Sequence, residues 1–194
     1  MTNPMVQENN DILDQIGMVA RWRPVHLGQH AVLNALCKKA KYVKIGIGSS
    51  NIYDYRSPFT LDETQDMLQL ALENHSNYEI IPVPDLFDGP RWRKMVLELF
   101  GELDLFITDN PYVADLMKED YQVVKPVTLV PMEERVRVSG TMVRKAMVQG
   151  EDWQELVPDN IAKYILDHKL DERFRNEFGL KTLAMENIIQ ERSN

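Results

Sequence analysis

The amino-acid sequence predicts an α/β protein built on a parallel sheet with helices on both faces. Short apolar runs typical of strands alternate along the chain with longer segments whose apolar residues recur at helical spacing. Such an alternating order of strands and helices favours a parallel sheet covered on both sides. The 194 residues are 44% hydrophobic and 27% charged, which suits one ordinary globular domain.

Each expected element rests on a local pattern. The second expected strand contains Lys44 as its only charge, and Pro82 and Pro84 end the third. We expect strands at 16–20, 43–48, 78–83 and 103–108, and one more extended segment at 121–130. We expect helices at 28–39, 61–74, 92–100, 111–118, 141–149 and 160–168. In this fold class ligands bind at the carboxyl ends of the strands, so functional residues should directly follow strands.

The chain is expected to have three parts. We expect an N-terminal extension at 1–14, the main domain at 15–169 and a charged helical tail at 170–194. In the tail, Leu170, Phe174 and Phe178 are spaced by four residues, which predicts an amphipathic helix. This helix packs either on its own domain or on a neighbouring subunit, and the sequence leaves both possibilities open.

Composition limits the class of protein. The net charge of −8 argues against binding nucleic acid, which needs clustered positive charge, but it permits a small anionic substrate. No apolar run approaches the roughly 18 residues that span a membrane, and the polar start does not resemble a signal peptide. We therefore expect a cytoplasmic protein. The single cysteine, Cys37, excludes an internal disulfide, and its apolar helical surroundings predict a core position.

The turn at 21–30, after the first strand, contains two arginines and two histidines. A helix start attracts anions through its free backbone amides. Gly28 would let a phosphate approach the backbone closely, and Arg21 adds a forked set of donors. His26 taken alone is better explained as a surface or capping residue. No Gly-Lys-Ser/Thr run is present, so a P-loop is excluded. Together the residues predict a polyphosphate site.

Segment 138–144 has a similar character. Ser139 or Thr141 can cap the helix that follows, and the free amides at its start suit a phosphate. Arg144 comes about one turn later, where its side chain can point back to the same anion. Because capped helices with an arginine are common, the chemistry alone is a moderate indication of a second phosphate site.

Residues between these two sites offer contacts to a nucleoside. Gly48 and Ser49 come at the end of the second strand, where glycine allows close approach of the backbone to a nucleoside, although a tight turn also explains the glycine. Trp92 lies in a polar context that is not typical of a core residue and suits stacking on a flat heterocycle. In the same region, residues 60 and 63 have capping-box spacing, which explains both without a functional role.

Both phosphate segments resemble signatures of the HxGH nucleotidyltransferase superfamily, which has a Rossmann-like fold. Residues 20–29 resemble Gly-Arg-Phe-Gln-Pro-x-His-x-Gly-His, and residues 139–144 closely resemble Ser-x-Thr-x-x-Arg. Within the superfamily, the chain most resembles the archaeal-type nicotinamide mononucleotide adenylyltransferases. Residues 57–63 resemble their Asn-Pro-Phe-Thr-x-x-Glu element, and Trp92 falls where they carry a tryptophan that stacks on nicotinamide. The resemblance covers about residues 16–168 and does not extend to the tail.

The chain departs from the family pattern at several positions. The most important departure is Gln29, where the family carries its second histidine. His30 comes one residue later than that position. Because each helical residue rotates the side chain by about 100°, we do not expect His30 to replace the missing histidine. The other departures in the quoted motifs are Ala20, Trp22, Arg23, Ser57, Thr64 and Asp109.

The resemblance implies adenylyl transfer from ATP to nicotinamide mononucleotide (NMN), giving NAD and pyrophosphate by direct in-line attack. Mg²⁺ is expected with ATP, no protein metal site is expected, and homo-oligomers are expected. Catalytic roles are implied for His26, Arg21, Arg144 and Gln29. Phosphate contacts are implied for Gly28, Ser139, Thr141 and Arg23, and nucleotide contacts for Gly48, Ser49, Asp85, Trp92 and Asn110. As a further hypothesis, Arg23 is an added cation that compensates for Gln29.

Two other functions stay open at this point. The first is adenylyl or cytidylyl transfer to a different phosphate ester, for which the same two motifs would serve. Trp92 and residues 57–63 favour the nicotinamide substrate over this alternative. The second belongs to a different class of protein. Gln29, Ser57 and Thr64 together are compatible with a chain that binds nucleotide but has impaired catalysis.

Overall fold

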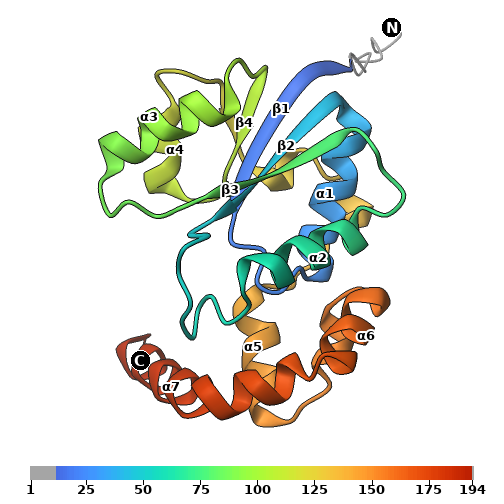
Figure 1. The fold of residues 1–194 in the computed structure, drawn as a ribbon, viewed down its shortest axis with the longest axis vertical. Coiled ribbons are helices and arrows are strands. Elements are labelled where there is room, and N and C mark those ends of the chain that lie inside the picture. The colour runs from blue at the N-terminus through green and yellow to red at the C-terminus, as the bar shows by residue number, and fades with distance from the viewer. Residues whose placement is uncertain (1–11, 194) are drawn as a thin grey trace, which may run out of the picture.

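The computed structural model describes residues 12–193, with side chains to residue 185, and contains a five-stranded parallel sheet (Figure 1). The strand order is β3-β2-β1-β4-β5, and each neighbouring pair is parallel. The strands are β1 (Leu13–Ala20), β2 (Ala40–Gly48), β3 (Tyr78–Val83), β4 (Leu105–Ile107) and β5 (Val123–Val124). The expected α/β fold with a parallel sheet is confirmed. Most of the expected N-terminal extension, residues 1–11, lies outside the described residues.

Helices cover both faces of this sheet (Figure 1). They are α1 (Leu27–Lys39), α2 (Leu61–Ala71), α3 (Gly89–Phe100), α4 (Pro111–Met117), α5 (Gly140–Gln149), α6 (Asp159–Asp167) and α7 (Leu170–Ser193). Helices α1 and α2 pack on one face, and α3 and α4 pack on the other. Helices α5 to α7 form a further group beyond α1 and α2, at the bottom of the view.

The two faces of the sheet have separate apolar clusters because side chains alternate along a strand. Ile16 and Met18 of β1 join the cluster formed with α1, α2 and the C-terminal helices, whereas Val19 packs with α3 and α4. Helix α3 lies close to the sheet at Gly46, where an added Cβ would come within 2.9 Å of the Phe100 ring.

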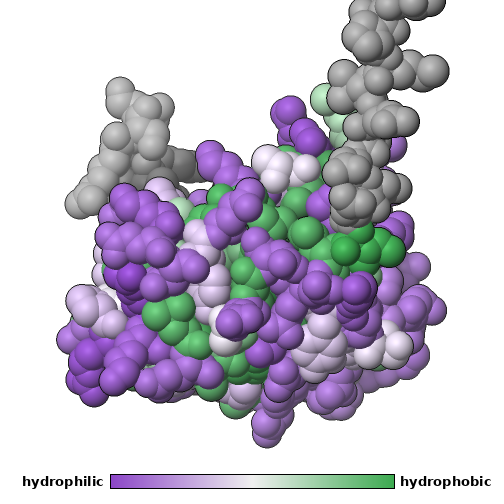
Figure 2. Space-filling model, turned by 90° about the horizontal axis from the view of Figure 1, so that it is seen from above, coloured by the Kyte–Doolittle hydropathy of each residue, from purple (hydrophilic) through white to green (hydrophobic). Residues whose placement is uncertain are grey.

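Hydrophilic residues cover most of the face seen in Figure 2, and hydrophobic side chains show between them toward the centre of the view. This distribution agrees with the burial of the apolar residues in the two clusters. Cys37 belongs to the core as expected, and burial raises the pKa of its thiol to about 11. Among the residues that the structure describes, no helix is both long enough and apolar enough to cross a membrane.

The segment expected to be extended over 121–130 differs from that prediction. Only Val123–Val124 forms a strand, and a 3-10 turn follows at Pro126–Thr128. Pro126 has no backbone N–H to donate to a neighbouring strand, so pairing cannot continue through it. Strand β4 is also shorter than expected, because it covers only Leu105–Ile107. The chain then turns away from the sheet and returns at residues 136–139 beside the start of α1.

Helix α7 packs on its own domain within the described residues. Leu170 and Phe174 are buried in the same apolar cluster as α1 and α2, and the Phe178 ring contacts the Tyr53 ring edge-to-face. Arg173 forms an ion pair with Glu63 at N–O distances of 2.5 and 2.7 Å. Glu63 also completes the expected capping box with Thr60 at the start of α2. The tail is therefore tied to the main domain by apolar and charged contacts.

Candidate functional site

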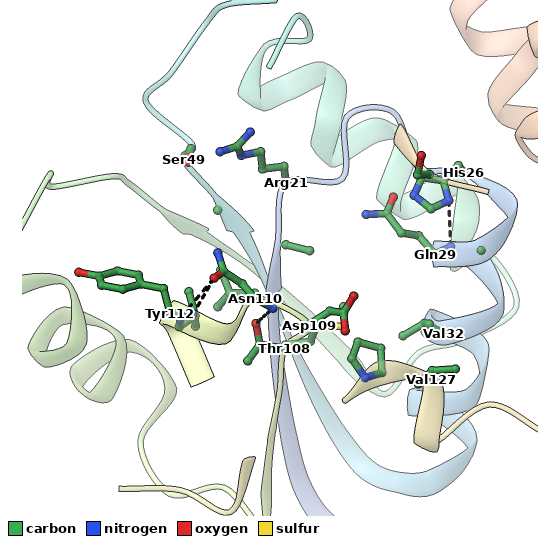
Figure 3. A pocket seen from close by; sticks show the side chains of 18 of the residues that line it. Arg21, His26, Gln29, Val32, Ser49, Thr108, Asp109, Asn110, Tyr112 and Val127 are labelled. Carbon is green, nitrogen blue, oxygen red and sulfur yellow. Dashed lines mark hydrogen bonds between the residues drawn. The ribbon is translucent and has the colours of Figure 1, made fainter. Parts of the chain in front are cut away.

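A cavity of about 850 Å³ lies at the carboxyl ends of β1 and β4 (Figure 3). The chain runs from the central strand β1 to β2 and β3 on one side, and β4 and β5 lie on its other side. The cavity is therefore at the topological switch point, where open parallel sheets bind their ligands. Its walls come from the ends of β1, β2 and β4, the starts of α1, α3 and α4, and the segment 126–139.

The turn between β1 and α1 forms one wall of the cavity. Arg21 directly follows β1, and its side chain extends toward Ser49 (Figure 3). The next residue, Trp22, is fully buried and donates its indole N–H to the carbonyl oxygen of Gly46 at 2.8 Å. This contact fixes the turn to β2. Arg21 is thereby held at the cavity wall, although its own side chain is exposed.

His26 is both the N-cap of α1 and a cavity residue. Its Nδ1 accepts the backbone N–H of Gln29 at 3.3 Å, so in the neutral ring the proton is on Nε2. Burial, and then the nearby charge of Arg144, lower the pKa of His26 to about 4. At neutral pH the ring is uncharged and offers one N–H donor.

The two motifs meet in space. An added Cβ at Gly28 would lie 2.9 Å from the carbonyl oxygen of Val136 and 3.0 Å from that of Val138, so the segment before α5 packs directly on the start of α1. An added Cβ at Gly140 would lie 3.9 Å from Cδ2 of His26. Gly28 thus serves the close approach of another backbone segment, in addition to lining the cavity.

Residues at the start of α5 line two different cavities. Ser139 caps the helix by accepting the N–H of Met142 at 3.3 Å, and it lines the main cavity. Thr141 and Arg144 line a second cavity of about 290 Å³, which also includes Arg21. Arg144 donates to the carbonyl oxygen of Arg23 at 2.9 Å and to the Thr141 hydroxyl at 3.3 Å. Arg144 thereby joins α5 to the β1–α1 turn.

The position of Arg23 contradicts its expected phosphate contact. Its side chain is 2% exposed and lines neither cavity. The guanidinium donates to the carbonyl oxygens of Ser49 and Ile52, at 3.3 and 2.8 Å, and to the Thr64 hydroxyl at 3.3 Å. Burial, and then the charge of Arg21, lower its pKa. Arg23 therefore holds the turn after β2, and these contacts do not support the hypothesis that it compensates for Gln29.

Gln29 lies in the first turn of α1, and its side chain reaches the cavity between His26 and Arg21 (Figure 3). Its Oε1 atom is buried and has no hydrogen-bond partner among the described residues. Because the oxygen and nitrogen of an amide can exchange places by rotation, the side chain can present either an acceptor or a donor to a ligand.

All five residues expected to contact the nucleotide line the main cavity; they are Gly48, Ser49, Asp85, Trp92 and Asn110. The backbone of Asp85 exchanges two hydrogen bonds with the Asn51 side chain, at 2.8 and 3.0 Å. Asn110 caps α4 by accepting the N–H of Tyr112 at 3.0 Å. These contacts hold both residues in the segments that follow strands β3 and β4, and Figure 3 shows Asn110 in the cavity.

The cavity lining also includes residues that the sequence interpretation did not name as contacts, among them Phe87, Asp109, Tyr112 and Arg135. Phe87 is 84% exposed and has a φ of 53°, and Tyr112 is also exposed. Asp109 places a carboxylate where the resembled family has glycine. Its position directly after β4 was a usable signal, because strand ends line such sites. The other three lie on turns or at a helix start, where sequence spacing gives no direction for a side chain.

Side chains that could bind a metal ion are dispersed over the described residues. No group of three or more His, Cys, Asp and Glu side chains is arranged there to hold a metal ion. The carboxylates of the main cavity, Asp85, Asp88 and Asp109, belong to separate strand ends and to the start of α3.

Proteins of similar sequence are nicotinamide-nucleotide adenylyltransferases. The protein from Methanothrix thermoacetophila is 34% identical over 161 residues, which are 81% of this chain and 92% of that protein. Those from Thermococcus kodakarensis and Pyrococcus horikoshii are 35% and 36% identical over 163 residues, with 81% of this chain and 85% and 86% of theirs covered. The chain belongs to the nicotinamide-nucleotide adenylyltransferase family. The expected family is confirmed, and no protein-family model matches the chain.

Solved structures show that the chain has a nucleotidyltransferase fold, as expected. A bifunctional NMN adenylyltransferase/ADP-ribose pyrophosphatase from Francisella tularensis, in complex with AMP and a manganese ion, superposes with a TM-score of 0.66 at 17% identity. The match covers 92% of this chain and 56% of that one, so the present chain spans just over half of the Francisella protein. A putative nicotinate-nucleotide adenylyltransferase from Vibrio parahaemolyticus superposes with a TM-score of 0.56 at 19% identity, covering 84% and 96%.

Proposed function

We propose that this chain transfers the adenylyl group of ATP to NMN and releases NAD and pyrophosphate. The observation that carries the proposal is one continuous cavity with a different chemistry at each end. Arg21, His26 and Gln29 supply hydrogen-bond donors at the start of α1 (Figure 3), whereas Trp92 supplies an aromatic surface on the wall formed by α3 and α4. Such a cavity suits two nucleotides whose phosphates meet in the middle.

The reaction needs alignment and charge neutralisation more than a nucleophile from the protein. An oxygen of the NMN phosphate attacks the α-phosphorus of ATP, and the bond from that phosphorus to the bridging oxygen of the diphosphate breaks. The electron pair leaves with pyrophosphate. Because the attacking phosphate is already an anion, no general base is required. Arg21, the Nε2–H of His26 and the amide of Gln29 stabilise the charge that develops.

Trp92 supports the proposal that NMN binds at the acceptor end of the cavity. Its ring is half-buried among the apolar residues of α3 and α4 while also lining the cavity. Stacking of a nicotinamide ring on this surface needs no strict hydrogen-bond geometry. Asp85 follows β3 and Asn110 follows β4, and both line the cavity, where they can contact the sugar or the amide group.

We assign Mg²⁺ as the metal that enters with ATP. The described carboxylates do not form a protein metal centre. Bound to the phosphates of ATP, the ion would supply positive charge in addition to that of the arginines. The manganese ion in the Francisella structure supports the use of a divalent cation. Assembly into homo-oligomers and a cytoplasmic location stay predictions.

The deciding experiment follows NAD and pyrophosphate together after mixing the protein with ATP, Mg²⁺ and NMN. We expect equal amounts of both products, and a loss of about 10²-fold or more in kcat for His26→Ala. His26→Asn keeps a side-chain oxygen for the helix cap, so an equal loss there excludes a folding defect. His168→Ala removes an exposed histidine at the end of α6 and should leave the rate unchanged.

Two other outcomes would replace the proposal. Pyrophosphate release with another phosphate ester, without NAD formation from NMN, would assign a different acceptor. If neither product forms while calorimetry shows that ATP still binds, the chain is a nucleotide-binding protein with impaired catalysis. Gln29, in place of the family's second histidine, would agree with that outcome.

A further inference from the structure

Arg23 joins the turn after β1 to three other elements of the fold. Its guanidinium donates to the carbonyl oxygens of Ser49 and Ile52 in the loop after β2, at 3.3 and 2.8 Å. Its Nε donates to the hydroxyl of Thr64 on α2 at 3.3 Å, and its backbone carbonyl oxygen accepts from Arg144 on α5 at 2.9 Å. One residue therefore links the β1–α1 turn to the loop after β2, to α2 and to α5.

The space around this guanidinium is closed. Arg23 and Thr64 are both buried, and Nη2 of Arg23 has no hydrogen-bond partner among the described residues. The Thr64 hydroxyl donates its own proton to the carbonyl oxygen of Thr60 at 2.7 Å. Because one nitrogen of Arg23 already lacks an acceptor, a second cation in the same space would be buried without partners, which is unfavourable. The site therefore holds one guanidinium and no more.

Two of the departures from the family pattern meet at this contact. The resembled motif of the β1–α1 turn has glutamine at the position of Arg23, and the resembled element at 57–63 continues with arginine at the position of Thr64. One position has gained a guanidinium and the other has lost one. Since Oγ1 of Thr64 lies within hydrogen-bond distance of Nε of Arg23, a long side chain from either position reaches the same space.

We propose that Arg23 and Thr64 are a compensating exchange that keeps one guanidinium between the β1–α1 turn and α2, and that Arg23 is a positioning residue for the reaction. The same turn carries Arg21 and His26 at the main cavity, which Ser49 also lines (Figure 3). The side chain of Arg23 lines neither cavity, so it acts through these residues. Its role in the reaction rests on the proposed function, whereas the compensating exchange does not.

Thermal unfolding of reciprocal variants of the full chain tests the exchange. Arg23→Gln removes charged hydrogen bonds and should lower Tm by roughly 5 °C. Thr64→Arg buries a second guanidinium and should lower Tm by roughly 10 °C or more, or prevent folding. The double variant Arg23→Gln/Thr64→Arg has one guanidinium again, so its Tm should return to within about 3 °C of the wild-type value.

Three control variants separate this pairing from general effects of charge. Lys38→Gln removes an exposed cation at the far end of α1 and should leave Tm unchanged. Gln69→Arg adds an arginine at an exposed position of α2, so it should not rescue Arg23→Gln. Arg23→Lys keeps the charge but lacks the planar fork of donors, so its Tm should stay below the wild-type value.

The rate of NAD formation, measured well below the Tm of each variant, tests the positioning role. Arg23→Gln should lower kcat by roughly tenfold or more, because the turn that carries Arg21 and His26 loses its anchor. KM for NMN should stay unchanged, since Trp92 lies on the wall formed by α3 and α4. The double variant should recover kcat. A purely structural role would lower Tm and leave kcat unchanged.

Three results would overturn the inference. They are a double variant no more stable than Thr64→Arg, rescue of Arg23→Gln by Gln69→Arg, and an unchanged kcat in Arg23→Gln. If the wild-type chain forms no NAD, the proposed function fails, and a restored Tm in the double variant still supports the exchange. If the wild-type chain forms NAD and the double variant recovers neither Tm nor kcat, the inference fails and the proposed function stands.

Discussion

At the scale of single residues, His26 shows how one side chain serves both the fold and the site. It caps α1 through Nδ1 and keeps its only proton on Nε2 at neutral pH. Burial and the charge of Arg144 lower the pKa of His26, so its ring stays uncharged at neutral pH when no ligand is bound. The cap therefore fixes the tautomer that the site needs.

This lowered pKa predicts a pH dependence of stability. The folded pKa of about 4 lies below the ordinary value of 6.5, so the unfolded chain takes up the proton first as the pH falls. Relative to His26→Asn, the wild-type protein should lose up to about 3 kcal/mol of unfolding free energy between about pH 6.5 and pH 4. Urea unfolding at several pH values, without ligand, measures the difference. A constant difference across this range would contradict the assignment.

Gln29 gives a second prediction at this scale. Arg23 is buried against the carbonyl oxygens of Ser49 and Ile52 and lies outside the cavity lining that Gln29 reaches. We expect Gln29→His to raise kcat by about tenfold, since a charge-assisted hydrogen bond is roughly twice as strong as a neutral one. Steady-state rates at saturating ATP and NMN test this, with Gln29→Asn as the control that adds no charge. An unchanged rate in Gln29→His would show that the amide suffices.

The sequence pattern gave the positions of the site residues more reliably than their roles. Arg23 and Arg21 are two positions apart in a cation-rich turn, and spacing alone does not show that one is buried. Likewise, glycine at 28 is explained by the carbonyl oxygens of residues 136 and 138, which approach from a segment more than a hundred positions later. Roles that depend on such distant contacts cannot be read from a local motif.

At the scale of elements, α7 shows where prediction succeeded. The spacing of Leu170, Phe174 and Phe178 predicted an amphipathic helix, and the helix is present. The surface that it covers was left open, because apolar spacing does not identify a partner. The segment 121–130 shows the opposite case, since its apolar residues suggested a strand and Pro126 ends the pairing after two residues.

The packing of α7 makes a testable contribution to stability. Phe174 is 1% exposed, so Phe174→Ala should lower the unfolding free energy by about 3–5 kcal/mol through lost burial and an unfilled cavity. Leu180 lies on the same helix and is 88% exposed, so Leu180→Ala should change it by less than about 0.5 kcal/mol. Denaturant unfolding of both variants gives the comparison. Equal effects would mean that α7 does not pack as described.

At the scale of the whole molecule, ligand binding should stabilise both faces of the sheet together. The main cavity takes residues from β1 and α1 on one side and from β4 and α4 on the other, so an occupant contacts elements of both apolar clusters. ATP with Mg²⁺ at 100 times its Kd should add about 2.7 kcal/mol to the unfolding free energy. Thermal unfolding should then show one cooperative transition with Tm raised by roughly 5–10 °C. Two separate transitions, or no shift, would oppose this coupling.

The buried position of Cys37 has a practical consequence. Only the thiolate reacts readily with alkylating reagents, and a buried thiol with a pKa of about 11 is both covered and protonated. Alkylation therefore has to wait until α1 opens, and the same helix begins at His26 beside the expected nucleotide. Because the chain has one cysteine, the rate at which it is alkylated measures how often α1 opens. It can follow occupancy of the site in the unaltered protein, even for nucleotides that never react.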